Sequence, residues 1–266
     1  DRLTRVIGPI AAVLVVVVAL IVVKVVTGGS KPKSGEKSVT AAATVIAQVT
    51  HVPETALNTV GIGSVKTAPT AISGPALTQG AKPLVLYIGA EYCPFCATER
   101  WGVVVALSRF GTFTNLGQTA SSPSDEHPNT ATLTFHGATY TSSHIAFTGK
   151  ETQSNQVEGN SYAKLDTLTA AETALAKKYG GGGIPFIDIG GKYTISGASF
   201  SPDVLQGKTH AQIAAALSDP SSAIAQGVDG TANLVTAAIC QSTAQQPTAV
   251  CQAAGVVKAT AKLTGS

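Results

Sequence analysis

The most constraining feature of the sequence is an apolar run that leads directly into a pair of cysteines. Residues 84–88 (Leu-Val-Leu-Tyr-Ile) have the length and composition of a buried β-strand, and the Gly-Ala pair at 89–90 lets the chain turn. Residues 93–96 then read Cys-Pro-Phe-Cys, and proline is favoured in the first turn of a helix. The sequence therefore predicts a strand, a turn and a helix that begins at this Cys-x-x-Cys motif.

This placement gives the two cysteines different expected roles. Cys93 would lie at a helix N-terminus, where unpaired backbone N–H groups and the helix dipole favour a thiolate over a thiol. Cys96 would lie one turn later on the same helix face, where it can close a disulfide with Cys93 and release a mixed-disulfide partner. We therefore predict a redox-active pair. A structural disulfide and half of a zinc site are the alternatives, and a zinc site would need two more ligands at suitable spacing.

A second motif far downstream completes the pattern. Residues 183–191 (Gly-Ile-Pro-Phe-Ile-Asp-Ile-Gly-Gly) place a proline at the start of another apolar strand. Together with the Cys-Pro-Phe-Cys motif, this segment resembles the active site and facing cis-proline of the thioredoxin superfamily. The resemblance implies an α/β, thioredoxin-like fold with a central mixed sheet flanked by helices. It also implies catalytic roles for Cys93, Cys96 and Pro185. The residues expected to contact a substrate are Tyr92, Pro94, Phe95 and Ile184.

The resemblance extends roughly from Val39 to Cys251, over which the chain is similar to a bacterial and archaeal family of membrane-anchored, thioredoxin-like proteins of unknown function. One position departs from the thioredoxin pattern. Thioredoxins carry a buried acid six residues before the first cysteine, and here that residue is Tyr87. The substitute proton acceptors for Cys96 are Glu91, Glu99 and Asp188, although carboxylates at such places are more often solvated or capping groups.

The N-terminal part of the sequence predicts a membrane anchor. Val6 to Val26 is apolar apart from Lys24 and long enough to span a bilayer as a helix. A cleaved signal peptide is the alternative, but no small-residue cleavage pattern follows Val26. The sequence contains no methionine, so we expect an N-terminal segment to precede Asp1.

Four regions follow from this interpretation. We expect a cytoplasmic stub at 1–5, a transmembrane helix at 6–26, a Gly/Ser/Lys-rich linker at 27–37 and a thioredoxin-like domain at 38–266. Basic residues flank both ends of the apolar run, so charge does not decide its orientation. The four cysteines occur as two local pairs, which suits an oxidising compartment and places the large domain outside the cytoplasm.

Composition limits the number of domains and the class of partner. A chain of 266 residues with 44% hydrophobic and 12% charged residues can bury one sizeable core. The net charge of +3 is small and scattered, which argues against a nucleic-acid partner.

Periodicity and turn residues predict the remaining elements. The expected helices cover two short segments within 39–60 and the segments 97–110, 165–179, 201–217 and 219–240, and the expected strands cover 130–135, 139–147, 186–189 and 193–196. More chain separates the first of the long helices from Pro185 than a minimal thioredoxin domain needs. We therefore expect an insertion there and extra helices at the C-terminal end.

The second cysteine pair is predicted to form a structural disulfide. A bridge between Cys240 and Cys251 would close a short loop and hold the C-terminal tail. The alternative is a second redox pair that exchanges electrons with Cys93. We expect no metal or other cofactor, because thioredoxin-fold copper proteins use a wider cysteine spacing and a dedicated histidine. None of the five histidines can be assigned that place from the sequence: His51, His127, His136, His144 and His210.

The leading functional hypothesis is a membrane-tethered, extracytoplasmic thiol–disulfide oxidoreductase. Its expected partners are cysteine-containing exported proteins or a membrane redox partner, and its direction depends on a reduction potential that the sequence does not fix. The competing hypothesis is a non-catalytic accessory subunit of a larger membrane complex, such as a respiratory one, because a fold alone does not determine function. A metallochaperone is a third, weaker hypothesis.

Overall fold

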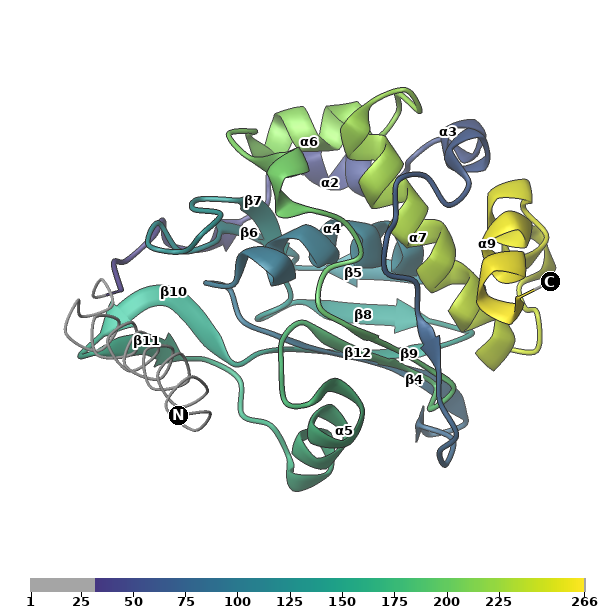
Figure 1. Ribbon diagram of the computed structural model, residues 1–266, viewed down its shortest axis with the longest axis horizontal. Coiled ribbons are helices and arrows are strands. Elements are labelled where there is room, and N and C mark those ends of the chain that lie inside the picture. Colours follow the sequence, from purple (N-terminus) through teal and green to yellow (C-terminus); the bar gives the residue numbers. More distant parts are fainter. Residues whose placement is uncertain (1–31, 266) are drawn as a thin grey trace, which may run out of the picture. The chain divides into compact units, whose positions relative to one another are not determined.

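The computed structural model describes residues 32–265, and these form a mixed α/β arrangement in which a mixed sheet is flanked by helices (Figure 1). This confirms the predicted fold class at that level. Within the described part of the chain, no helix is both long enough and apolar enough to cross a membrane. The predicted stub at 1–5 and the predicted spanning helix at 6–26 lie outside the described residues.

The main sheet is built around β4 (Lys82–Gly89), which continues into the cysteine motif. It has six strands, with β12 (Phe186–Ile189) antiparallel to β4 on one side and β9 (Ala146–Glu151) parallel to it on the other. The remaining strands of the sheet are β2 (Thr70–Ala71), β3 (Thr78–Gln79) and β13 (Tyr193–Ser196). The register pairs Gly89 with Glu151 and Ile88 with Phe186. The end of β4, the end of β9 and the start of β12 therefore meet beside Cys93.

Side chains alternate between the two faces of this sheet and so divide the core into two parts. Odd-numbered residues of β4 and β12, such as Tyr87 and Ile187, pack with α4 (Pro94–Ser108) and α7 (Ala223–Ser242). Even-numbered residues pack beneath α5 (Ala170–Gly180) on the other face: Leu86, Ile88 and Phe186. Figure 1 shows α4 and α7 on one side of the sheet and α5 on the other.

The helices α4 and α7 approach each other closely at Gly102. A Cβ atom at this position would lie 2.6 Å from Thr231 Cγ2, a distance at which something must shift. Glycine therefore permits the tight contact of the two helices. This contact holds the helix that begins at the cysteine motif against the buried α7.

The other strands form three small sheets, and the other helices cover the main core. The sheets pair β1 (Val39–Thr40), β6 (Gly117–Ala120) and β7 (Ala131–Thr134); β5 (Gly111–Thr114) and β8 (Thr139–Ser142); and β10 (Gln153–Glu158) and β11 (Ser161–Lys164). The helices are α2 (Ala43–Thr50), α3 (Glu54–Val60), η1 (Pro202–Leu205), α6 (His210–Ala216), α8 (Thr248–Cys251) and α9 (Ala254–Thr264).

Several predicted elements differ from the observed ones. The segment 139–147, predicted as one edge strand, contains β8 and the start of β9, because the chain turns where Ser142 Oγ accepts hydrogen bonds from the N–H groups of His144 and Ile145. The predicted helix at 165–179 begins only at Ala170, where Thr169 and Glu172 form a capping box. The segment 201–217 is divided into η1 and α6. In 219–240, where one or two helices were expected, the structure has one, α7.

The predicted linker at 27–37 is shorter than expected, because its described end lies against the domain. Gly35 N–H donates to Asn155 O at 2.9 Å, and Val157 N–H donates to Ser34 Oγ at 2.9 Å. Ser38, the next residue after the predicted linker, donates its hydroxyl to Glu91 at 2.8 Å. Residues 33–37 are therefore part of the folded domain, and they lead the chain toward the turn that precedes Cys93.

Candidate functional site

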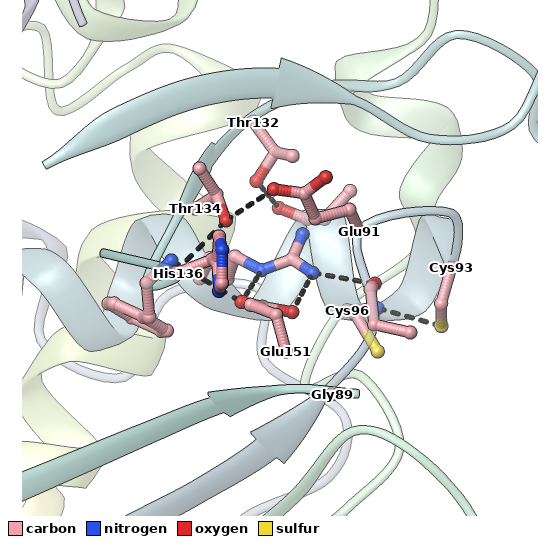
Figure 2. Close-up of polar contacts among 12 residues, drawn as sticks. Gly89, Glu91, Cys93, Cys96, Thr132, Thr134, His136 and Glu151 are labelled. Carbon is pink, nitrogen blue, oxygen red and sulfur yellow. Dashed lines mark hydrogen bonds and ion pairs between the residues drawn. The ribbon is translucent and has the colours of Figure 1, made fainter. Parts of the chain in front are cut away.

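The cysteine motif adopts the predicted strand, turn and helix. Cys93 is the N-cap residue of α4 with extended backbone angles, and Pro94 occupies the first helical turn. The N–H of Cys96 donates to Cys93 Sγ at 3.2 Å, so the sulfur takes the place that a capping oxygen usually has (Figure 2). Both cysteines are unbridged thiols. Cys93 keeps 5% exposure and Cys96 has none, so Cys93 is the sulfur that a partner can reach.

The surroundings shift the pKa values of the two thiols in opposite directions. The pKa of Cys93 is lowered, chiefly by the hydrogen bond from the Cys96 side chain and against the effect of burial, with further help from the Cys96 N–H and the charge of Arg100. Burial raises the pKa of Cys96 well above its ordinary value, and the neighbouring Cys93 raises it further. These opposite shifts favour the thiolate form at Cys93 over that at Cys96.

The Ile184–Pro185 peptide bond is cis, and Pro185 is buried directly before β12. Ile184 lines two surface hollows. One, of about 530 Å³, also contains Phe95, and the other, of about 490 Å³, also contains Tyr92. Tyr92 directly precedes Cys93 and Phe95 directly precedes Cys96, so each hollow is lined by a residue next to a cysteine.

The residues predicted to contact a substrate differ in how deeply they are buried. Tyr92 and Phe95 are half-buried, and each is supported by a second ring: Tyr92 stacks on Tyr162 at 4.4 Å, and Phe95 meets the edge of His127 at 5.8 Å. Pro94 is buried at the start of α4 and lines neither hollow. The exposed surface beside the cysteines is therefore aromatic.

A buried ion pair lies behind the cysteine motif. Arg100 and Glu151 are both fully buried, and two nitrogens of Arg100 donate to the two carboxylate oxygens of Glu151 at 2.7 Å each. Arg100 also donates to Ala90 O at 2.6 Å, and the same oxygen accepts the N–H of Cys93. The ion pair therefore holds the turn that carries Cys93.

The charges of this pair act on the thiols. Arg100 lowers the pKa of both cysteines, and Glu151 raises the pKa of Cys96. Burial opposes the charge of Arg100, but Glu151, Tyr87 and Cys96 together outweigh burial, so the pKa of the guanidinium is raised. Burial also raises the pKa of Glu151, and Arg100 partly offsets this. Arg100 therefore stays charged beside the cysteines.

Polar groups extend from the ion pair to the surface. Glu91 accepts hydroxyl hydrogen bonds from Ser38 and Thr134, and Thr134 accepts the N–H of His136. Figure 2 shows Glu91 and Glu151 within one group of polar side chains. The charge of Glu91 contributes to the raised pKa of Glu151.

The half-exposed ring of His136 closes this network at the surface. Its Nδ1 lies 2.9 Å from the Asp166 carboxylate, which also accepts the N–H of Glu151 at 2.8 Å. The network therefore joins the interior beside Cys96 to solvent.

The three predicted substitutes for a proton acceptor lie in different places. Glu91 belongs to the network behind the motif. Glu99 is fully buried and accepts two hydrogen bonds from Ser199, and burial raises its pKa to about 7. Asp188 is an even-numbered residue of β12 and therefore faces α5, away from the face of the sheet that carries α4. Tyr87 stays neutral because burial raises its pKa well above its ordinary value.

Sequence reasoning missed the two residues closest to the thiol chemistry, Arg100 and Glu151. Arg100 could have been found, because it lies four residues after Cys96 and therefore on the same helix face. Glu151 could not, because its position follows from the pairing of β9 with β4, and the segment before it was predicted as an edge strand.

The second cysteine pair is bonded, with Cys240 joined to Cys251. Ser242, two residues after Cys240, lies against Ile189, which pairs with Val85 near the start of β4. Cys93 follows the other end of that strand. The structure therefore does not bring the two cysteine pairs together, and direct exchange between them has no geometric support.

Among residues 32–265, no group of three or more His, Cys, Asp and Glu side chains is arranged so that it could hold a metal ion.

Comparison with known proteins gives one match. A family model described as a domain of unknown function (DUF929) matches residues 68–241, a range that includes the Cys-Pro-Phe-Cys motif, Glu151 and Pro185. No curated protein and no solved structure matches the chain.

Proposed function

Because the chain belongs to DUF929, a family described only as a domain of unknown function, we propose its activity from its own residues: a thiol–disulfide oxidoreductase with a thioredoxin-like site. The observation that carries this proposal is the arrangement of the two thiols. Cys93 caps α4 and has a lowered pKa, and Cys96 lies buried behind it within hydrogen-bond distance. The cis bond before Pro185 and the parallel pairing of β4 with β9 support the thioredoxin-like assignment.

The proposed reaction begins with the Cys93 thiolate. It attacks one sulfur of a substrate disulfide, so the substrate S–S bond breaks, a mixed disulfide forms at Cys93 and the released substrate sulfur takes a proton. Cys96 then loses its proton and attacks Cys93 Sγ. A Cys93–Cys96 disulfide forms and the second substrate thiol leaves. Two electrons have passed to the substrate, and the reverse sequence oxidises it.

The second step needs help, because burial disfavours the Cys96 thiolate. We assign Arg100 as the positioning residue that lowers this cost, because its charge lowers the pKa of Cys96 and its hydrogen bond holds the turn before Cys93. Glu151 is the buried carboxylate whose charge raises the pKa of Cys96, and its two oxygens hold Arg100 in place.

The hollows around Ile184 support a polypeptide substrate. They share Ile184, and Tyr92 and Phe95, the neighbours of the two cysteines, offer apolar contacts within them. We propose that cysteine-containing exported proteins or a membrane redox partner bind there, with the domain tethered outside the cytoplasm by residues 6–26. The Cys240–Cys251 disulfide supports an oxidising compartment.

Trapping of the mixed disulfide tests this proposal. When the full chain is incubated with oxidised glutathione, the Cys96→Ser variant should accumulate a glutathione adduct on Cys93, because the resolving thiol is gone. The Cys93→Ser variant should accumulate none, because the remaining thiol of Cys96 is fully buried and has a raised pKa. Intact-mass spectrometry followed by peptide mapping reads the adduct. If neither variant forms one, the accessory-subunit hypothesis takes first place.

A further inference from the structure

A hollow of about 350 Å³ lies on the opposite face of the sheet from α4 and α7, between α5 and the loop at residues 72–77. Its wall is mostly apolar, formed by Ile72, Pro75, Leu77, Ala171, Ala174 and Leu175. It contains Asp188 and Gly191, near the far end of β12 from Ile184. This hollow is therefore separate from the two that Ile184 lines. Its volume is at the small end of the range for ligand pockets.

One acidic group lies buried in this apolar wall. Asp188 has no exposure, and its Oδ1 accepts the N–H of Gly191 at 2.8 Å. Its Oδ2 has no hydrogen-bond partner among the described residues. A buried carboxylate oxygen without a partner is costly, and such atoms in folded proteins usually have one. Burial raises the pKa of Asp188, which is the expected response of an unpaired acid.

The carboxyl group belongs to the wall of the hollow rather than to the sheet. The backbone of β12 pairs with β4 on one side and with β13 on the other, where Asp188 stands opposite Leu86 and Thr194. The backbone of Asp188 thus belongs to the paired strands, and its side chain lies on the sheet face that carries α5. The even-numbered neighbours on this face, such as Phe186, are apolar.

The nearest cationic side chain in the wall does not pair with this acid. The Lys178 ammonium lies 4.7 Å from the centre of the Tyr179 ring, and no ion pair joins it to Asp188 among residues 32–265. The Tyr179 hydroxyl donates to Ser73 O. Lys178 and Tyr179 thus have other contacts, and the hollow offers one buried acceptor within an apolar surface.

We propose that this hollow binds a small organic amine whose apolar body fills the space and whose primary ammonium group donates to Asp188 Oδ2. An ammonium group offers three donors and a charge opposite to that of the carboxylate. An alcohol of the same shape brings a single donor and no charge, and a carboxylate is repelled. This site is independent of the proposed thiol chemistry.

Three probes of one shape test the proposal on the full chain by isothermal titration calorimetry: 2-phenylethylamine, 2-phenylethanol and phenylacetate. The amine should bind at least about tenfold more tightly than the alcohol, because only the amine brings a positive charge to the buried carboxylate. Phenylacetate should bind most weakly. In the Asp188→Asn variant the amine should lose at least about tenfold in affinity, whereas the alcohol should change little.

Two controls keep this result interpretable. Asparagine retains an oxygen that can accept the Gly191 N–H, so Asp188→Asn should keep the wild-type circular dichroism spectrum and the glutathione adduct of the Cys96→Ser background. The Lys178→Met variant tests whether Lys178 forms an ion pair with Asp188 in solution. Under the proposal, this variant binds the amine more tightly than the alcohol by the same factor as the wild type. Binding that appears only after Lys178→Met, equal affinity for amine and alcohol, or no binding of any probe would overturn the proposal.

Discussion

The Arg100→Met variant is expected to lose about 3–5 kcal/mol of unfolding free energy, because removing one partner of a buried ion pair leaves the other charge uncompensated. Among the described residues, the buried Glu151 carboxylate would then keep only the weak contact of 3.5 Å from the Phe135 N–H. The pKa of Cys93 should rise, because the Arg100 charge lowers it in the wild type. Urea unfolding measures the first effect, and the ultraviolet absorbance of the thiolate as a function of pH measures the second.

Two further variants separate the structural role of Arg100 from its role at the thiols. In the double variant Arg100→Met/Glu151→Leu, no buried charge is left over, so most of the lost stability should return, whereas the pKa of Cys93 should stay raised. Arg109→Met is a matched control at the other end of α4, where the arginine pairs with the half-exposed Glu54. It should leave the pKa of Cys93 unchanged. A wild-type pKa for Cys93 in both Arg100 variants would remove Arg100 from the proposed mechanism.

The stability of the domain is expected to fall as pH rises toward the raised pKa of a buried acid, Asp229. This residue of α7 has no exposure, and neither of its carboxylate oxygens has a hydrogen-bond partner among the described residues. Burial raises its pKa from 3.8 to about 8. Between these values the folded chain keeps a proton on Asp229 that the unfolded chain releases.

The sign and size of this effect follow from the two pKa values. The contribution of Asp229 to stability is fully present below pH 3.8 and is lost as pH rises to about 8. At about 1.4 kcal/mol per pH unit, the loss between pH 4 and pH 8 is on the order of 5 kcal/mol. Glu99 adds a loss of the same sign between pH 4.5 and about 7.

Urea unfolding of wild type, Asp229→Asn and Glu99→Gln across this pH range tests the assignment. Asp229→Asn should flatten most of the decline up to pH 8, because the amide does not ionise. Glu99→Gln should flatten only the part below about pH 7. An Asp229→Asn variant whose stability declines with pH as steeply as that of the wild type would mean that Asp229 is not the buried acid responsible.

The local part of the site was predictable from the sequence because its signals are local. The apolar strand, the turn and the helix-starting proline lie within 20 residues of each other, and each segment predicts its own local structure. The capping box at Thr169 and Glu172 is an equally local signal that would have corrected the start of α5. The position of Arg100, four residues after Cys96, is a third local signal.

The rest of the site depends on long-range pairing that periodicity does not encode. Glu151 reaches the cysteines only because β9 pairs in parallel with β4, and the composition of this segment does not encode which strand it pairs with. Asp188 was one of the three residues predicted as substitute proton acceptors. The register of β12 on β4 decides which face it occupies, and a shift of one residue would exchange the faces.

The measurement that bears most directly on the redox assignment is the reduction equilibrium of Cys93 and Cys96 in the full chain. Glutathione buffers of known potential set the poise, and thiol trapping with mass spectrometry counts the free thiols. We predict one reversible two-electron transition at a potential between roughly −270 and −120 mV, the range of thioredoxin-type oxidoreductases. The Cys240–Cys251 bond should stay intact throughout. A Cys93–Cys96 pair that stays entirely reduced or entirely oxidised across this range would contradict the proposed function.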